Sequence, residues 1–226
     1  KQFAKYWLHN GLVNINGQKM SKSLGNTILL SDLLSEYNPD VIRMTLLQNN
    51  YRSNLNIVDG MFAINEEKVY RFYKLLSEID QFRNEVAVND VLAKIERDFK
   101  EAMDNDFNTA VAFANLFEYF SEMEKLLQKN DVQKLNEYKD AIRSVYRILG
   151  MFQQEPALVI DEIKMKYLKK YGVSVSEIKD LIAKRNEFKN ENNYREADLI
   201  REKLLKKGII IKDTRTETEW DAEIKA

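Results

Sequence analysis

Hydrophobic positions recur every three or four residues along most of the chain, a pattern that predicts a mainly helical protein. Between residues 63 and 152 four such stripes follow one another, and Gly150 ends the last. The stripes are Val69, Phe72, Leu76 and Ile79; Val91, Ile95, Phe99 and Met103; Phe113, Leu116, Phe120, Met123 and Leu127; Leu135, Tyr138, Ile142, Val145 and Leu149. Four consecutive amphipathic helices predict an antiparallel four-helix bundle over residues 63–152.

The segment before the bundle combines a short strand with two helices. Residues 12–15 alternate between apolar and polar types, and the Asn16-Gly17 pair that follows is typical of a tight turn. Further along, Asn38-Pro39 places a proline where a helix begins. We expect a shorter helix before it, capped by Ser31 and Asp32.

The C-terminal part changes character after the bundle. Residues 153–160 contain Pro156 and little helical period, which predicts a linker. Two further helices and a buried strand at residues 209–211 follow, and residues 217–221 are expected to pair with that strand. The apolar positions of these helices are Ile178, Leu181 and Phe188, then Ala197, Ile200 and Leu204.

Composition narrows the classes of protein. The 226 residues carry a formal net charge of −1, so any nucleic-acid binding must come from local basic patches. The absence of cysteine excludes disulfides and thiolate zinc sites within this chain. No apolar run approaches the roughly 20 residues that span a bilayer, and no secretory signal opens the chain, so we expect a soluble, cytoplasmic protein without membrane contact.

The candidate chemistry lies in the string Lys19-Met20-Ser21-Lys22-Ser23, which stands between two glycines. Two ammonium groups three positions apart on a hinged loop can follow the charge of a polyphosphate as it shifts during displacement at phosphorus. A solvated loop is the alternative for any short basic segment. This five-residue string should arise by chance on the order of once in ten thousand chains of this length, so we interpret the loop as functional.

Two other clusters have structural explanations at this stage. Asp106 and Asn108 stand before an apolar run, which favours helix capping over a metal site. The aromatic stripe of Phe113, Phe117 and Phe120 is more typical of core packing than of a cofactor slot. The single histidine, His9, fits a packed or hydrogen-bonded side chain better than a substrate contact.

The string at residues 19–23, followed by Leu-Gly-Asn, resembles the signature loop of class I aminoacyl-tRNA synthetases. The order of the flanking motifs resembles the cysteinyl-tRNA synthetase family over nearly the whole chain, and in particular its C-terminal half. These motifs are Tyr6-Trp7-Leu8-His9-Asn10-Gly11, Tyr51-Arg52-Ser53-Asn54-Leu55-Asn56, Asp104-Asn105-Asp106-Phe107-Asn108-Thr109, and Ala197-Asp198 with Arg201.

The resemblance implies a domain order. It runs from the end of a class I catalytic domain with the lysine loop (1–27), through a helical stem-contact segment (28–62) and a tRNA-binding bundle (63–152), past the linker (153–160), to a small α/β anticodon-recognition module (161–226).

The resemblance also implies an activity. The intact family activates cysteine with ATP to cysteinyl-adenylate and transfers cysteine to tRNA(Cys). Lys22 and Lys19 are the implied catalytic residues, and Lys19, Met20, Ser21, Lys22 and Ser23 are implied to bind ATP, which is used with Mg²⁺. Zn²⁺ is implied only for an N-terminal half that this chain lacks. We expect a monomer that is inactive without that half.

Eight residues are candidate tRNA contacts. Arg43 and Arg52 are candidates for phosphate contacts, and the alternative for each is a pair with a surface carboxylate. The anticodon candidates are Arg185, Lys189, Tyr194, Asp198, Arg201 and Asp213. The family often has Trp where Tyr194 stands and Arg where Lys189 stands, which changes stacking and bidentate contact. Asp198 has the alternative of pairing with Arg201, and Asp213 that of closing a turn.

Two other functions stay open from the sequence. A related ATP-dependent cysteine ligase joins cysteine to an amino sugar with the same activation chemistry, but it needs no anticodon module. A non-catalytic helical RNA-binding or scaffold protein would make the lysine loop incidental. Residues 161–221, which begin with a basic stretch over residues 161–212, argue against the first of these.

Overall fold

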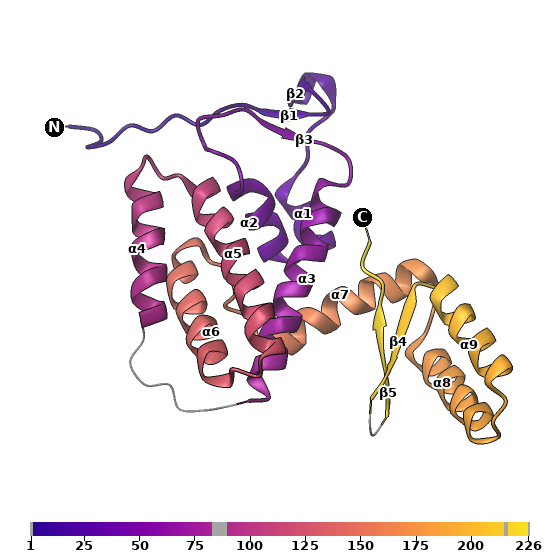
Figure 1. Ribbon diagram of the computed structural model, residues 1–226. Coiled ribbons are helices and arrows are strands. Elements are labelled where there is room, and N and C mark those ends of the chain that lie inside the picture. Colours follow the sequence, from indigo (N-terminus) through magenta and orange to yellow (C-terminus); the bar gives the residue numbers. More distant parts are fainter. Residues whose placement is uncertain (1, 83–89, 215–216, 226) are drawn as a thin grey trace. The chain divides into compact units, whose positions relative to one another are not determined.

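The computed structural model describes residues 2–82, 90–214 and 217–225, which form two compact units. One unit ends at Ala157 and the other covers Leu158–Lys225. Figure 1 shows the helices that dominate both, as the apolar periodicity predicts. Among the described helices, none is both long enough and apolar enough to cross a membrane.

The first unit is built around the predicted four-helix bundle. Its helices are α3 (Met61–Asp80), α4 (Asp90–Asp104), α5 (Thr109–Gln128) and α6 (Val132–Tyr146), which lie side by side in Figure 1. Ile79 and Leu116 are completely buried. The rings of Phe72 and Phe120 stack with their centroids 3.7 Å apart. The aromatic stripe of α5 therefore belongs to the core, as expected.

Two helices precede the bundle, α1 (Leu30–Glu36) and α2 (Pro39–Leu47). Asn38 caps α2, because its side-chain oxygen accepts a hydrogen bond from an amide of the first turn, and Pro39 is the first helical residue. This start is the predicted one.

The predicted cap of α1 is wrong. Leu29 occupies the capping position without a side-chain bond, and Ser31 and Asp32 lie inside the first turn. The Ser31 hydroxyl donates to the Asp32 carboxylate instead of capping an amide. The charge of Asp32 still favours this end of the helix through the helix dipole.

A three-stranded sheet adjoins one end of the bundle (Figure 1). Its strands are β1 (Val13–Ile15), β2 (Gln18–Lys19) and β3 (Leu55–Ile57), in the order β2-β1-β3. β1 runs antiparallel to β2 and parallel to β3. Asn16 and Gly17 both have positive φ, 49° and 80°, which confirms the predicted tight turn.

The second unit is a small α/β module. It contains all but the first two residues of α7 (Pro156–Tyr171), together with α8 (Val175–Asn190), α9 (Tyr194–Lys206), β4 (Ile209–Asp213) and β5 (Thr218–Ala222). β4 and β5 pair antiparallel, as predicted, with Ile211 opposite Trp220. Ile178, Leu204 and Ile209 form the centre of a separate core. The unit therefore has its own source of stability.

The linker expected at residues 153–160 is wrong in its second half. α7 already begins at Pro156, and its Val159 is 1% exposed. Proline fits the first position of a helix, where its missing N–H costs nothing, so Pro156 starts a helix here and does not break one. Phe152, just before the expected linker, is completely buried against the rings of Phe72 and Phe120.

Candidate functional site

The lysine loop, residues 19–23, begins at the end of β2 and has an ordered local structure. Ser21 caps a short 3₁₀ helix, η1 (Lys22–Leu24), by accepting a hydrogen bond from the Leu24 amide at 3.4 Å. Gly25 ends η1 in the left-handed region with φ 66°. Asn26 closes the loop: its Oδ1 accepts from the Ser21 amide at 2.9 Å and its Nδ2 donates to the Lys19 carbonyl at 3.3 Å.

Both ammonium groups of this loop face solvent. Lys19 and Lys22 are exposed, and neither takes part in an ion pair among the described residues. Met20 is half-buried, and its amide bonds the Val13 carbonyl of β1 at 2.9 Å. The hydroxyls of Ser21 and Ser23 lie 3.2 Å apart. A preformed loop therefore carries two cations that are free to meet an anion.

A second stretch, residues 50–59, contacts the strand and turn that lead into the lysine loop. The side-chain oxygens of Asn54 and Asn56 accept hydrogen bonds from the amides of Leu12 and Gly17, at 2.9 and 2.8 Å. Gly11 approaches the backbone so closely that a Cβ there would stand 2.1 Å from the Ser53 carbonyl oxygen. Only glycine fits this position. Two of the motifs that carry the resemblance are therefore pressed against each other.

Arg43 has a carboxylate partner, but a buried one. Its Nη1 lies 3.7 Å from Oδ1 of Asp40, which is 1% exposed, while the Arg43 side chain is 46% exposed. Oδ2 of Asp40 accepts from the Tyr73 hydroxyl at 2.7 Å and from the Phe152 amide at 2.8 Å. Burial raises the pKa of Asp40, and these bonds and Arg43 oppose the rise. The exposed part of Arg43 keeps a phosphate contact open.

Arg52 also has a carboxylate partner, Asp106, at the start of the bundle's α5. The guanidinium donates two hydrogen bonds to Asp106, one of them from Nη2 at 3.0 Å, and the Tyr51 hydroxyl donates a third at 2.8 Å. These bonds lower the pKa of Asp106 to about 2. Asp106 therefore does not cap α5, which corrects that expectation. Asn108 does cap it, through the Val111 amide.

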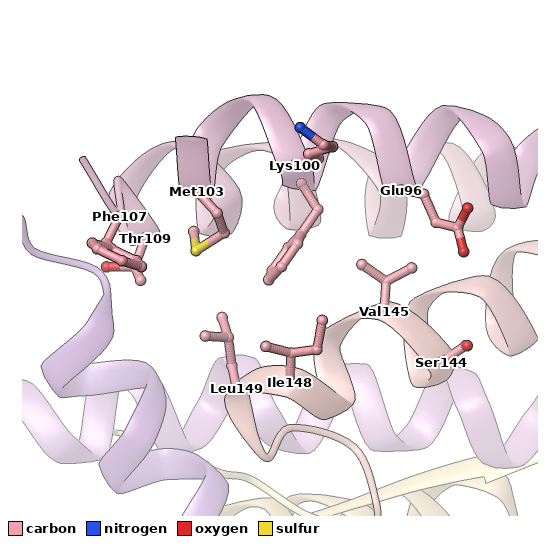
Figure 2. Close-up of a pocket in the computed structure, with 10 residues that line it drawn as sticks. Glu96, Lys100, Met103, Phe107, Thr109, Ser144, Val145, Ile148 and Leu149 are labelled. Atoms are coloured by element: carbon pink, nitrogen blue, oxygen red, sulfur yellow. The ribbon is translucent and has the colours of Figure 1, made fainter. Parts of the chain in front are cut away.

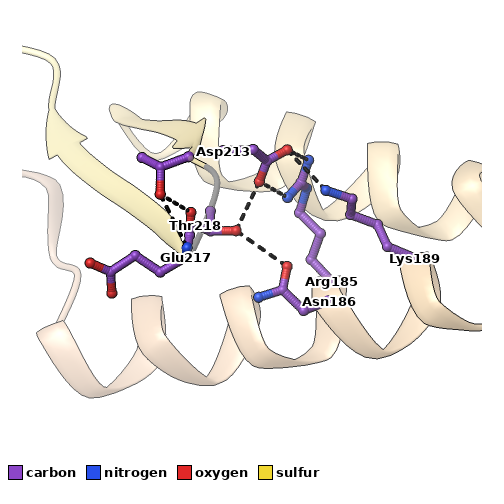
Figure 3. Close-up of polar contacts among 7 residues, drawn as sticks. Arg185, Asn186, Lys189, Asp213, Glu217 and Thr218 are labelled. Carbon is purple, nitrogen blue, oxygen red and sulfur yellow. Dashed lines mark hydrogen bonds and ion pairs between the residues drawn. The ribbon is translucent and has the colours of Figure 1, made fainter.

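In the second unit, Asp213 collects several of the expected anticodon residues into one network (Figure 3). Arg185 donates to both carboxylate oxygens, at 2.8 and 2.9 Å, and Lys189 and the Thr218 hydroxyl donate at 3.0 and 2.8 Å. The hydrogen bonds from the Arg185 guanidinium make the largest contribution to holding the pKa of Asp213 well below its usual range.

This network gives Arg185 a structural part. Its side chain is 6% exposed and both terminal nitrogens are bonded to Asp213, so it joins α8 to β4, and its phosphate contact stays a prediction. Asp213 is 41% exposed and Lys189 36% exposed. These two retain a face to solvent, so an RNA contact remains a prediction for them.

Tyr194, Asp198 and Arg201 lie on the outer face of α9. All three are exposed, and Tyr194 has a relative exposure of 59%. The expected neighbouring stripe packs inward, with Ala197 and Leu204 buried. The alternative pairing of Asp198 with Arg201 is not among the ion pairs of the described residues, in which neither side chain takes part. The exposed ring is free to stack.

Comparison with known proteins shows what this chain is similar to. Residues 1–67 match the family described as tRNA synthetases class I (C) catalytic domain, and residues 98–153 match the DALR domain. A cysteine–tRNA ligase of Thermodesulfovibrio yellowstonii is 36% identical over 99% of this chain and 49% of its own length. Cysteine–tRNA ligases of Persephonella marina and Francisella tularensis subsp. novicida are each 37% identical, over 97% and 96% of this chain and 49% and 45% of their own.

The resemblance to cysteinyl-tRNA synthetases is confirmed. The chain spans about half the length of the cysteine–tRNA ligases it matches. The class I catalytic segment contains the lysine loop together with Arg43 and Arg52, and the DALR segment contains Asp106. The second unit lies outside both segments, but the alignments with the cysteinyl-tRNA synthetases extend over at least 96% of the chain.

An apolar pocket of about 550 Å³, most of it within the DALR segment, lies between α4 and the residues at and just after the end of α6 (Figure 2). Met103, Ile148 and Leu149 face the hollow, and Ile148 is 75% exposed. Glu96 and Lys100 are its charged lining residues. No residue of the lysine loop lines it. The sequence did not indicate this pocket, because much of its lining comes from apolar stripes that predict core packing.

Proposed function

We propose that the protein to which this chain belongs activates cysteine with ATP to cysteinyl-adenylate and transfers cysteine to tRNA(Cys). This chain would supply the lysine loop and tRNA-binding surfaces. The observation that carries the proposal is the pair of exposed ammonium groups on an ordered loop inside the class I catalytic segment. The alignment of nearly the whole chain with proteins named cysteine–tRNA ligase supports the choice of amino acid and acceptor.

The chemistry follows from where charge develops. A carboxylate oxygen of cysteine attacks the α-phosphorus of ATP, the bond to the bridging oxygen breaks, and pyrophosphate leaves with the electron pair. Negative charge therefore builds on the bridging and pyrophosphate oxygens. Lys22 and Lys19 act as catalytic residues by stabilising that charge, because an ammonium group gains most where the charge is greatest. Ser21, Ser23 and Met20 complete the ATP-binding loop.

The metal ions stay predictions. Mg²⁺ accompanies ATP in this kind of reaction because it neutralises phosphate charge. A zinc ion that selects the cysteine thiol needs ligands from outside this chain, since the chain has no cysteine and one histidine. Among the described residues, no cluster of three or more His, Asp or Glu residues is suited to a metal ion.

On the tRNA side, the second unit reads the anticodon. Tyr194 stacks on an unpaired base, Asp198 accepts from a base edge, and Arg201 and Lys189 neutralise phosphate. Asp213 holds Lys189 in place, which gives it a supporting part in the same surface. Arg43 contacts backbone phosphate nearer the stem. Aminoacylated tRNA is used by ribosomes, so we propose that the protein acts in the cytoplasm. We also propose that it acts as a monomer.

The exposed apolar side chains before the bundle support a larger catalytic domain. Phe3 is 92% exposed, Trp7 67% and Leu30 59%. Several large apolar side chains exposed in one part of the chain are typical of a surface that another domain or protein covers. The parallel pairing of β1 with β3 is typical of sheets covered on both faces. We propose that this surface packs against the part of the catalytic domain that the longer cysteinyl-tRNA synthetases carry.

The test compares acceptors. The complete protein is supplied with radiolabelled cysteine and ATP, and with either tRNA(Cys) or an amino sugar. The proposal predicts labelled tRNA and no conversion of the sugar, and a version ending at residue 157 should still activate cysteine but lose discrimination between tRNA(Cys) and an anticodon mutant. Conversion of the sugar alone would establish the related ligase. If the complete protein neither activated cysteine nor transferred it, the function as a non-catalytic RNA-binding protein would be favoured.

A further inference from the structure

One carboxylate joins the bundle to residues 50–59, the stretch that contacts the strand and turn before the lysine loop. Asp106 lies in the connection between α4 and α5, and it binds Tyr51 and Arg52, more than 50 positions earlier in the chain. Both carboxylate oxygens are used: Oδ1 accepts from the Tyr51 hydroxyl and from Nη2 of Arg52, and Oδ2 accepts from Nε. A guanidinium held in this bidentate way has a defined orientation as well as an attraction.

Hydrogen bonds lead from this junction to the lysine loop. The Tyr51 carbonyl accepts from the Gly11 amide at 2.7 Å, and the Leu55 amide donates to the Leu12 carbonyl at 2.8 Å. β3 then pairs with β1, and β1 pairs with β2, which ends at Lys19. The backbone at Gly11 lies directly against the backbone of residues 53–54, where a side chain would clash. These contacts form a continuous hydrogen-bonded path from residues 51–55 to the base of the loop.

The bundle side of the junction is backbone that needs support. Asp106 and Phe107 have φ of 55° and 52°, the left-handed region that non-glycine residues seldom adopt, and two in succession are costly. Such a conformation persists where surrounding contacts hold it. Phe107 lines the pocket of Figure 2 while Asp106 holds Tyr51 and Arg52, so two neighbouring residues of one short connection fix it from two sides.

We propose that Asp106 is a positioning residue for the activation reaction: it fixes the lysine loop relative to the helical bundle, so that the two move together. The proposal rests on the proposed function for its catalytic consequence, but its mechanical part stands on this junction alone. A bundle that binds tRNA would thereby hold a fixed position relative to the residues that bind ATP. The competing explanation is an exposed ion pair without consequence, since Arg52 and Asp106 are 57% and 46% exposed.

Hydrogen exchange in the complete protein separates the two explanations without relying on activity. Asp106→Asn removes the charge but keeps a residue that tolerates positive φ. Asp104→Asn is the matched control, because Asp104 ends α4 two residues before Asp106 and pairs with the exposed Lys100 instead of Arg52. We expect peptides covering residues 10–24 to exchange about two- to fivefold faster in Asp106→Asn, the range for losing one well-oriented exposed pair, and no change in the control. Equal exchange in both variants would overturn the proposal.

Cysteine-dependent ATP–pyrophosphate exchange then tests the catalytic consequence. Asp106→Asn should lower kcat by a similar two- to fivefold and leave the KM for cysteine unchanged, because only the placement of the lysines is altered. Arg52→Gln should do the same, and the double variant should lose no more than either single one. Additive losses would refute a shared role. If the wild-type protein showed no exchange reaction while hydrogen exchange still changed as expected, the proposed function would fail and the mechanical link would stand.

Discussion

At the scale of single residues, Asp213 and Arg185 differ in how much each depends on the other. Arg185 is 6% exposed and its Nε has no hydrogen-bond partner among the described residues, whereas Asp213 is 41% exposed. Asp213→Asn leaves a buried cation with one weaker acceptor, and we expect it to destabilise the second unit by about 3 kcal/mol, the low end for an uncompensated buried charge. Arg185→Met leaves a carboxylate that water can reach, and should cost less than about 1 kcal/mol. Urea unfolding measures both, and equal losses would contradict this asymmetry.

The same carboxylate predicts an acid sensitivity. The pKa of Asp213 is lowered in the folded unit, mainly by the hydrogen bonds from Arg185, so its contribution to stability is present above about pH 4, where an unfolded aspartate is ionised. The contribution is lost as the pH falls below that value toward the lowered folded pKa. Unfolding measured between pH 6 and pH 2 should show a steeper loss for the wild type than for Asp213→Asn. Asp198→Asn, which removes an exposed carboxylate outside the network, should follow the wild type.

Tyr194 tests the RNA-facing surface. Its exposed ring should stack on a base, so Tyr194→Ala should weaken tRNA(Cys) binding by the complete protein by about 1–3 kcal/mol, and Tyr194→Phe by much less. Leu199→Ala is the control, since Leu199 is 50% exposed on the same helix but offers no ring. Filter binding or fluorescence titration gives the affinities. A comparable loss from Leu199→Ala would mean that the effect comes from α9 as a whole.

At the scale of elements, Asp40 joins three segments through one buried carboxylate. It lies in α2 and accepts from Tyr73 of α3 and from the Phe152 amide after α6. Asp40→Ala leaves a buried hydroxyl and a buried amide without an acceptor, at about 1–3 kcal/mol each, so thermal unfolding of the first unit should show a loss of about 2–5 kcal/mol. Asp40→Asn should cost less, because its amide oxygen can still accept and burial already disfavours the charge. Asp32→Ala on α1 is the exposed control, and a loss as large there would contradict the account.

The elements that sequence predicted best are those with a strong period or a turn signal. The helices α3–α6, α8 and α9, the turn at Asn16-Gly17 and the β4–β5 pair all follow from local pattern. α7 was missed because Pro156 reads as a breaker when it follows a polar stretch, although it also suits a first helical turn.

The candidate site divides along the same line. The lysine loop could be proposed from the sequence alone, because its candidate chemistry lies within five consecutive residues, and its role stays a prediction. The contacts of Arg185 with Asp213, of Arg52 with Asp106 and of Asp40 with Tyr73 could not be predicted. Each pair is separated by at least 28 positions, and no periodicity indicates which side chains meet across a fold. Asp106 shows the difference most clearly: its sequence neighbours indicate a cap, whereas its contacts come from Tyr51 and Arg52.

At the scale of the whole molecule, the candidate catalytic loop and the candidate anticodon-binding residues lie in different units. The lysine loop and bundle lie in the unit that ends at Ala157, and the anticodon candidates lie in Leu158–Lys225, which has its own core. Each unit also has its own buried ionic group, Asp40 in the first and Arg185 in the second. Changes in the second unit should therefore alter tRNA binding while leaving cysteine activation intact.

Cysteine-dependent ATP–pyrophosphate exchange by the complete protein tests the central claim most directly. Lys22→Ala should slow this exchange by about two or more orders of magnitude, the scale for losing one preorganised charge at the developing pyrophosphate. Lys5→Ala is the matched control, because Lys5 is an exposed lysine on the same segment but outside the loop. The account predicts a large loss for Lys22→Ala and none for Lys5→Ala. Exchange at the wild-type rate in Lys22→Ala would contradict it.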